Sequence, residues 1–426
     1  MATDVDVQFF SHLNGLILGN NWGDLIRLLD KTLVTGIEFT QITAASIDEQ
    51  GDVHINLYSA HNAMLFQVVE LTGFAPASFN QKYRIKGVPN TTQLILKPHT
   101  AIAETSITTV GAGKLASLGY DIIFRDANDV KRVYRAKNPS AQHPFIRVDE
   151  SLASDTGSYT STYAKFAMVG LLEHMDHIDD YENPDVLQLP FDPADPVKNW
   201  KITGTGTGVI RGWSRWYWAA SRTVSGSNIG DTSTPPNLSR EFNLFGGPDN
   251  FYLITQVNTN NRDTLCLGCG LYEEVIDSSI IYPWFLTTVL YPVTASESWQ
   301  FMQAVGCTPF VKDTIATNRV SDTFLITSFN ELDPIKPHAL ATPIVPDSYS
   351  GRTNLYPSGY ISALEVPFYS EGRLRGVIPH ILYAGKTVSG FGALLSGNHM
   401  YLTTPVGARP GSGQNSGYYI YLGELE

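Results

Sequence analysis

The sequence predicts a mainly β protein of several domains, sandwich-like or barrel-like, with one short helix near its N-terminus. Only 16% of the 426 residues are charged, whereas 36 are Gly, 24 are Pro and 11% are aromatic, a composition typical of many short strands joined by turns. Short runs in which apolar and polar residues alternate recur along the chain. A chain of this length exceeds the size at which one hydrophobic core stops growing, so we expect two or three domains.

The helix is predicted in the segment NWGDLIRLLDKTLV. Leu25, Leu28, Leu29 and Leu33 fall on one stripe at helical spacing, and Asp24 stands where a side chain can cap the first turn. We therefore expect a short amphipathic helix, capped by Asp24, that opens the fold.

Period-two alternation begins after the turn signal QGD at residues 50–52. Val53, Ile55 and Leu57 alternate with more polar neighbours, which predicts a half-buried strand. Similar apolar runs recur at 65–71, 83–88 and 93–96, separated by Gly and Pro. Several strands within about sixty residues indicate a small barrel or sandwich of its own.

The rest of the chain alternates between predicted strands and loops. Strands are expected between residues 106 and 149, around the loop NPSAQHP, and in FYLITQV, LEVPFY, HMYLTTPV and GYYIYLGELE. The proline-broken stretch at about 182–198 predicts a long ordered loop draped over a surface. The stretch at about 224–239 predicts a segment that is disordered or is ordered by a partner.

The charge, the N-terminal residues and the cysteine count argue against several classes of protein. The formal net charge is −12, and no basic stripe is interleaved with aromatic residues, which argues against a nucleic-acid partner. The first residues lack the pattern of a signal peptide, and no apolar run is long enough to cross a membrane. Three cysteines are too few for a disulfide framework, which suits synthesis in a reducing cytoplasm.

The acidic segment 173–180, EHMDHIDD, has the most metal-like spacing of oxygen and imidazole ligands. It lacks the glycine and the terminal glutamate of the twelve-residue calcium loop. His174 and His177 are three residues apart, without the HExxH spacing of a helical zinc site. We expect a solvated or interface loop rather than a metal site.

Three further motifs are weak signals of chemistry. Cys266 and Cys269 have CxxC spacing, but no βαβ pattern surrounds them, so we expect two buried core residues. The run GTGTG at 204–208 lacks the last glycine of a phosphate loop, and no GxSxG motif is present for a hydrolase nucleophile. A pair of glycosidase carboxylates among the 41 acidic residues stays open.

The run WSRWYW at 213–218, with Trp200 nearby, has two interpretations. Aromatic faces and an arginine suit a sugar-binding site. Alternatively, period-two alternation places Trp216 and Trp218 on one face of a strand and Arg215 and Tyr217 on the other, so that one aromatic face is buried in a core or a subunit interface. We favour the second interpretation.

Six blocks of sequence resemble a family of virion proteins from tailed bacteriophages and prophages. They occur in the family's order over nearly the whole chain: LLDKTLVTG, YDIIFRDANDVKRVYRAKNP, PFIRVDES, YAKFAMVGLLEHMDHIDD, REFNLFGGPDNFYLIT and GRLRGVIPHILY. His380 departs from the pattern, because the family has Gly at that position, and the loop at 224–239 has no counterpart. Residues 42 to about 98 resemble a small β-domain that some members carry as an insertion. The resemblance implies incorporation into the virion and implies no catalytic residues.

These observations lead to one expected organisation and function. Residues 1–155 are expected to form an N-terminal domain with the small inserted β-domain at about 42–98, and residues 156–426 a larger β-rich domain. The expected function is structural, by assembly in the tail, baseplate or collar, with copies of itself and neighbouring tail or baseplate proteins as partners. No enzymatic activity, cofactor, catalytic residue, metal, nucleic acid or membrane is expected. The alternatives are a host-surface glycan-binding adsorption protein, marked by Trp213, Trp216 and Trp218 exposed around a groove, or a polysaccharide-degrading enzyme of the virion.

Overall fold

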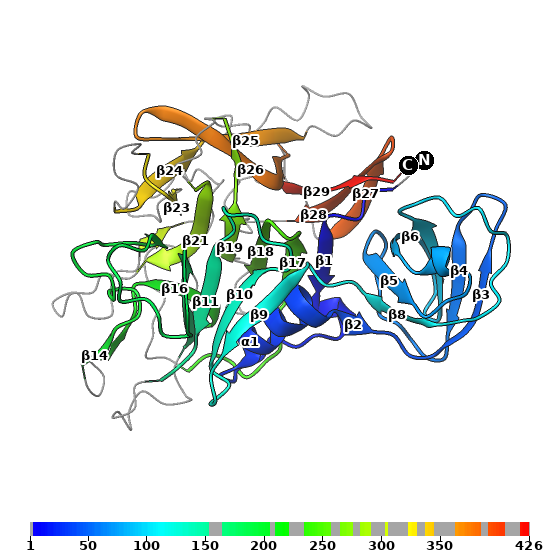
Figure 1. The fold of residues 1–426 in the computed structure, drawn as a ribbon, viewed down its shortest axis with the longest axis horizontal. Helices are drawn as coiled ribbons and strands as arrows, with labels where there is room; N and C mark the ends of the chain where they lie inside the picture. The colour runs from blue at the N-terminus through cyan, green and yellow to red at the C-terminus, as the bar shows by residue number, and fades with distance from the viewer. Residues whose placement is uncertain are drawn as a thin grey trace.

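The chain is mainly β, with one short helical segment and several sheets, as the sequence predicts (Figure 1). The computed structural model describes residues 3–152, 164–204, 209–220, 234–256, 265–275, 282–290, 303–305, 323–329, 337–344, 363–384, 391–404 and 418–425. In these ranges no helix is long and apolar enough to cross a bilayer.

The predicted helix forms, but its cap is not the expected one. α1 (Asp24–Leu29) continues into the π-helical turn η2 (Asp30–Thr35), and its leucines are buried. The N-cap residue is Gly23, and the buried carboxylate of Glu150 accepts hydrogen bonds from the amides of Gly23 and Ile26. Asp24 lies one position later, where its side chain accepts from Asn21 N. The prediction of an Asp24 cap is therefore wrong, because a residue distant in sequence takes that role.

A curled antiparallel sheet wraps around this helix. Its strands are hydrogen-bonded in the order β9, β10, β11, β12, β16, β21, β19, β18, β17 and β1. Apolar side chains of α1 pack against one face of it, because alternate residues of each strand turn toward the helix. The strand bounds are β1 (Gln8–Ser11), β9 (Tyr120–Arg125), β10 (Lys131–Ala136), β11 (Phe145–Asp149), β12 (Lys165–Leu172), β16 (Ser214–Ala219), β17 (Phe242–Gly246), β18 (Asn250–Thr255), β19 (Leu265–Leu271) and β21 (Trp284–Leu290).

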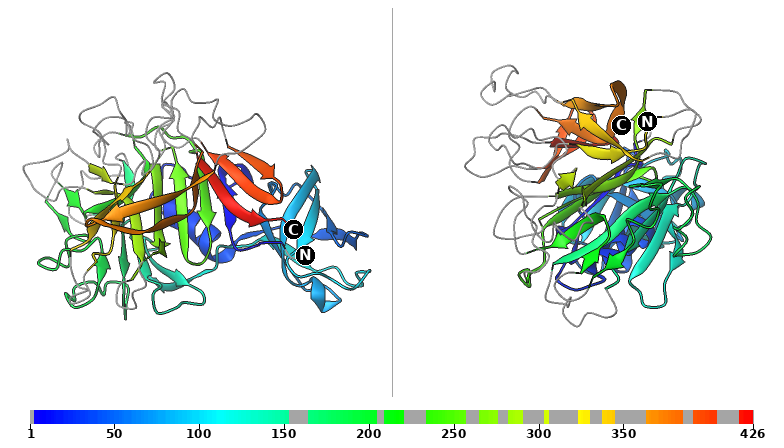
Figure 2. Two further views of the ribbon diagram at one scale, coloured as in Figure 1. Left: turned by 90° about the horizontal axis from the view of Figure 1, so that it is seen from above. Right: turned by 90° about the vertical axis from the view of Figure 1, so that its left-hand side faces the viewer.

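The C-terminal strands fold back over the other face of β17–β21. Phe245, Tyr252 and Phe285 from that face share a core with Phe368 and Ile420 of the covering strands. The views in Figure 2 show these covering strands as a separate layer, drawn from yellow to red. Their order is β24 (Ala339–Pro343), β25 (Leu364–Ser370), β26 (Arg373–Tyr383), β29 (Tyr418–Glu424), β28 (His399–Thr404) and β27 (Gly392–Ser396), and β23 (Phe324–Ile326) joins β24 to β21.

The small β-domain is a seven-stranded sheet at the right of Figure 1. It reaches beyond the expected range of 42–98, because its first and last strands pair with each other. Gly36 lies just before the first strand, beside the end of the last, where the chain enters and leaves the small domain. Its φ is left-handed at 74°, and a Cβ there would lie 2.2 Å from Leu115 O. The strand order is β2 (Ile37–Glu38), β8 (Ala112–Leu115), β5 (Val68–Thr72), β6 (Lys82–Asn90), β7 (Gln93–Pro98), β4 (Val53–Leu57) and β3 (Ile42–Ile47).

Buried polar side chains fasten this small domain to the rest of the chain. The Gln8 side chain donates to Val68 O and Ala116 O and accepts from Val68 N. The Arg84 guanidinium donates to carbonyl oxygens of both terminal segments, at Asp4 and at Leu422. The termini lie side by side as a result (Figure 1), and Asp4 N donates to Glu424 O at 2.9 Å.

The expected boundary near residue 155 falls between two strands that pair with each other, since β11 and β12 match over five residues from Phe145 to Asp149. The stretch at 182–198 contains only the short strand β13 (Gln188–Leu189), so it is loop for most of its length. Of the loop at 224–239, residues 224–233 lie outside the described residues. Six short elements complete the described part: η1 (His12–Asn14), η3 (Ala77–Phe79), β14 (Ile202–Thr203), β15 (Ile210–Arg211), β20 (Glu273–Glu274) and β22 (Gln303–Val305).

Candidate functional site

The tryptophan-rich run forms β16, and both faces of this strand are buried. The indole of Trp216 donates to Thr287 O at 3.0 Å, and the ring of Trp218 packs edge-on against Trp22. The favoured interpretation of a buried strand is confirmed for Trp216 and Trp218. The expectation that only one face is buried is wrong, because β16 lies inside the sheet between β12 and β21, and core surrounds both of its faces. Trp216 and Trp218 therefore present no ring to a ligand.

Trp213, just before this strand, is only partly buried, and its ring already contacts two neighbouring side chains. Lys198 Nζ lies 4.1 Å from the ring centre, and the ring of His338 lies 4.9 Å away. This tryptophan therefore belongs to a packed surface cluster.

Next to β16, cationic side chains pack against aromatic rings in the interior. Arg211 lies 4.8 Å from the ring of Trp22 and 4.6 Å from that of Phe166, and Arg215 lies 4.4 Å from Phe166. Burial, and then a neighbouring arginine, lower the pKa of Lys165 to about 8. Cation–π attraction offsets part of the cost of burying these charges, and Arg211 and Arg215 also donate hydrogen bonds to Ser151 O and to the hydroxyl of Tyr217. These residues come from distant segments of the sequence, and no motif in it predicts that they meet.

The acidic segment is held by donors of the same chain. Asp179 Oδ1 accepts from Lys131 Nζ at 2.8 Å and from Arg147 Nη2 at 2.7 Å. Burial acts to raise the pKa of Asp179, but these two hydrogen bonds outweigh it and the pKa is lowered. Glu173 accepts from the hydroxyl of Tyr282 at 2.8 Å.

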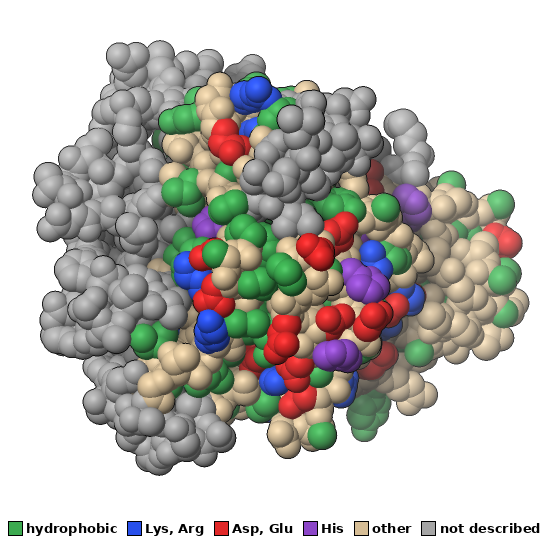
Figure 3. All heavy atoms as spheres, turned by 60° about the vertical axis from the view of Figure 1, so that its left-hand side comes forward, with side chains coloured by type: hydrophobic (Ala, Val, Ile, Leu, Met, Phe, Trp, Pro, Cys, Tyr) green, Lys and Arg blue, Asp and Glu red, His purple; other side chains and the backbone are tan. Residues whose placement is uncertain are grey.

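On the face shown in Figure 3, acidic side chains and histidines gather among neutral ones. Within the described ranges, no group of three or more His, Cys, Asp or Glu is arranged to hold a metal ion. The carboxylates of Asp179 and Glu173 are engaged with donors, so they are not poised as free ligands.

The two cysteines of the CxxC motif lie in β19 and belong to the two different cores. Burial raises the pKa of Cys266 to about 12 and raises that of Cys269 well above its ordinary value. Thiols that remain protonated and point to opposite faces of a strand are poor nucleophiles and poor joint ligands. Cys307 and residues 205–208 of the glycine-rich run lie outside the described residues.

One arrangement that the sequence did not suggest resembles a serine-hydrolase triad. Ser140 Oγ lies 2.9 Å from His143 Nδ1, and His143 Nε2 lies 2.8 Å from Asp249 Oδ1. The amide of Ser140 also donates to His143 Nδ1 at 2.8 Å, so the nitrogen that would have to accept the serine proton is occupied by a backbone amide. The imidazole instead fastens the loop at 138–144 to the turn before β18. Trp284 reinforces this attachment by donating to Gln142 O.

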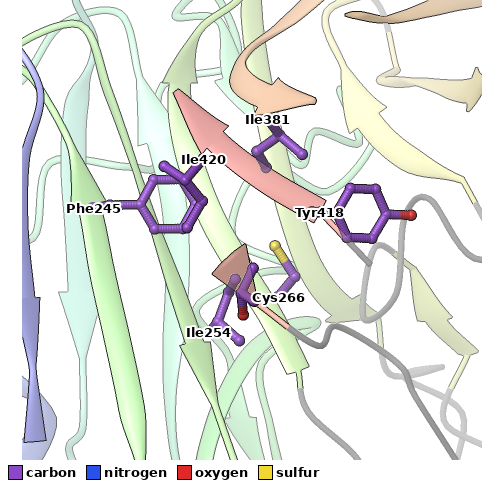
Figure 4. Close-up of a pocket in the computed structure, with 7 residues that line it drawn as sticks. Phe245, Ile254, Cys266, Ile381, Tyr418 and Ile420 are labelled. Atoms are coloured by element: carbon purple, nitrogen blue, oxygen red, sulfur yellow. The ribbon is translucent and has the colours of Figure 1, made fainter. Parts of the chain in front are cut away.

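Figure 4 shows a small apolar pocket between the two layers, with an empty volume of about 210 Å³ that includes open solvent. It contains no carboxylate, which a glycosidase site would need. The hydroxyl of Thr404 is buried there, and no described residue forms a hydrogen bond with it. The lining residues are Phe245, Ile254, Cys266, Ile381, Thr404, Tyr418 and Ile420.

The strongest candidate site is the outer face of the C-terminal layer, on β24–β29. One half of it carries an apolar patch, which we define as Leu340, Ile344, Tyr369 and Leu374, each between 45% and 49% exposed. Tyr369 and Leu374 are direct cross-strand partners, and Thr342, between Leu340 and Ile344, pairs with Tyr369. The four side chains therefore share one face, opposite to the side chains that enter the core.

The other half of this face carries a tyrosine patch, which we define as His399, Tyr401 and Tyr421. Tyr401 and Tyr421 are cross-strand partners with ring centres 5.5 Å apart, and the ring of His399 lies 5.8 Å from that of Tyr421. The sequence analysis did not single out these residues; the signal that could have found them is the tyrosine content of the last two predicted strands.

No protein-family model matches this chain, and no curated protein matches it.

Proposed function

We propose that this chain is a structural component of a tailed-phage virion, made in the host cytoplasm and assembled into the tail, baseplate or collar. The observation that carries the assembly function is the apolar patch on β24–β26. A half-covered antiparallel sheet normally alternates apolar residues toward the core with polar residues toward water. Here leucine, isoleucine and tyrosine occupy the water-facing side instead.

The grouping of four apolar side chains on one face suits a contact with another subunit. Single exposed apolar side chains are common, but neighbours on one rigid face mark interaction sites. Full burial of such a side chain contributes about 1.5–3 kcal/mol, so covering the exposed half of four of them contributes about 3–6 kcal/mol. Strand pairing already fixes the backbone of Tyr369 and Leu374, which lowers the entropy lost on association.

The backbone at His380 supports the resemblance to virion proteins. His380 has a left-handed φ of 66°, a conformation that favours glycine, and it stands where the family pattern has Gly. The resemblance lies in sequence blocks alone, so agreement with a backbone angle is an independent argument for it.

The geometry of the other candidate sites also favours a non-enzymatic function. The serine–histidine–aspartate arrangement has its basic nitrogen occupied by an amide, and the CxxC thiols are buried on opposite faces. The tryptophans that would have formed a sugar-binding groove at 216 and 218 are core residues.

The test measures self-association of the purified chain and its association with purified tail proteins, by mass photometry. Leu374→Asp should weaken association at least about tenfold, because it places a charge in the buried contact. Ile17→Asp is the matched control, since Ile17 is an exposed apolar residue of the loop before α1, outside the patch. About 1 M salt should leave the assembly intact, because salt screens ion pairs and not apolar burial.

The proposal fails if proteomic analysis and a cryo-EM map of intact particles do not contain the chain. It also fails if Leu374→Asp and Ile17→Asp have the same effect on association, or if salt alone disperses the assembly. Release of reducing sugar from host capsule by the purified chain would indicate the enzyme alternative instead.

A further inference from the structure

The tyrosine patch differs in chemistry from the apolar patch on the same sheet. Its rings carry hydrogen-bonding groups at their edges, and these groups contact one another. His399 Nδ1 lies 3.1 Å from the hydroxyl of Tyr421 and 3.7 Å from Glu424 Oε1. The side chains of His399 and Glu424 are 46% and 51% exposed, so donors and acceptors line the patch at its solvent edge.

The rings of this patch are held firmly by the fold. Tyr401 lies between two cross-strand neighbours, Leu394 and Tyr421, and packs edge-on against the buried ring of Tyr419 at 5.9 Å. Burial raises the pKa of Tyr401 and of Tyr421, so both hydroxyls keep their protons at neutral pH and can donate hydrogen bonds. A pre-formed aromatic surface loses little side-chain entropy when it binds a ligand.

Rigid, partly exposed aromatic rings with polar groups at their edges suit a saccharide. The face of a phenol ring is electron-rich and attracts the weakly positive C–H groups on one side of a sugar ring, while sugar hydroxyls need donors and acceptors beside it.

The charges around the patch select among saccharides. Burial, and then the carboxylates of Glu424 and Asp4, raise the pKa of Tyr421, and Glu424 Oε1 lies 3.7 Å from His399 Nδ1. A sugar with its own carboxylate or sulfate would be repelled by these groups, whereas a neutral sugar would gain acceptors for its hydroxyls.

We infer that the outer face of β28 and β29 is a binding site for a neutral oligosaccharide, which stacks on Tyr401 and Tyr421 and hydrogen-bonds to His399 and Glu424. This inference does not rest on incorporation into a virion, because it uses a different half of the sheet from the assembly contact. It places a glycan site on tyrosines of the C-terminal layer, at a distance in sequence from the tryptophan run that first suggested one.

The test applies the full chain to a printed array of neutral glycans, such as maltohexaose, dextran and N-acetylglucosamine oligomers, beside acidic ones such as hyaluronan and polysialic acid. The neutral glycan with the strongest signal is then titrated by isothermal calorimetry. Tyr401→Leu and Tyr421→Leu keep apolar bulk but remove the ring face, so each should weaken binding at least about tenfold. Tyr401→Phe keeps the ring and should remain within about threefold of the unchanged chain.

Tyr58→Leu is the matched control, because Tyr58 is a highly exposed tyrosine of the small domain, and it should bind like the unchanged chain. Circular dichroism melts check that each variant is folded, and Tyr401→Phe keeps the test informative if a leucine variant is not. Binding to no neutral glycan, binding to acidic glycans alone, or equal losses in Tyr58→Leu and Tyr401→Leu would each overturn the inference. A change of oligomeric state in Tyr421→Leu without any glycan binding would overturn it too, and would assign the patch to the subunit contact.

Discussion

Arg84 is the residue whose replacement should most clearly separate the small domain from the rest of the protein. It lies in β6, it is fully buried, and its guanidinium donates five hydrogen bonds to four carbonyl oxygens. These carbonyls belong to Asp4 and Val7 of the N-terminal segment, to Phe66 of the small domain and to Leu422 of the last strand. Arg84→Met removes every donor while it keeps most of the apolar volume.

The expected cost follows from the acceptors that lose their partners. Each buried carbonyl left without a donor costs about 1–3 kcal/mol, and water that enters the gap recovers part of it. Removing the guanidinium also relieves the cost of burying a charge, the same burial that lowers the pKa of Arg84 to about 9. We therefore expect the free energy of unfolding to fall by about 3–5 kcal/mol, and by about half of that in Arg84→Lys, whose ammonium reaches fewer carbonyls.

The assay is guanidinium denaturation followed by two signals. All seven tryptophans lie outside residues 37–115, so their fluorescence reports the main body, while far-ultraviolet circular dichroism reports the whole chain. In Arg84→Met the two transitions should separate, because the small domain no longer unfolds together with the termini. Lys82→Met removes the same charge from an exposed position of the same strand and should change stability by less than about 0.5 kcal/mol. Equal effects of Arg84→Met and Lys82→Met would refute this reasoning.

Three further predictions test buried or partly buried polar groups. Burial raises the pKa of Glu150 from 4.5 to about 7, so its contribution to stability is present below about pH 4.5 and is lost as pH rises through 7. That decline of about 3 kcal/mol should disappear in Glu150→Gln when unfolding is measured from pH 4 to 8, and identical slopes in both proteins would contradict it. Thr404→Val should raise the free energy of unfolding by about 1 kcal/mol, because it removes a buried hydroxyl with no hydrogen-bond partner among the described residues. Thr403→Val, which removes a hydroxyl that donates to a carbonyl, should give no gain. Asp179→Asn should lower stability by about 1 kcal/mol, a value reduced for the 43% exposure of Asp179, and EDTA should leave the melting temperature unchanged. A shift of several degrees with EDTA that is absent in Asp179→Asn plus Asp180→Asn would reveal a bound cation.

Local sequence predicted the elements well where one face of the element is buried. The alternation of Val53, Ile55 and Leu57 marks β4, and the leucine stripe marks α1. At β16 it predicted the strand and the burial of Trp216 and Trp218, but not that both faces are buried, because alternation of residues does not show what packs on the second face. The sequence predicted the last strands, but it did not show which of their tyrosines remain exposed.

By itself the sequence determined the mainly β class, the short helix and the existence of a small β-domain, because composition and periodicity depend on neighbours within a few residues. Only the tertiary structure decided which distant residues meet. Glu150 caps a helix 124 residues away, and Arg84 joins both ends of the chain. The apolar and tyrosine patches arise in the same way, since strand pairing and the core beneath them decide which side of β24–β29 faces water. Such contacts depend on how the sheets curl and stack, and that packing is a property of the whole chain.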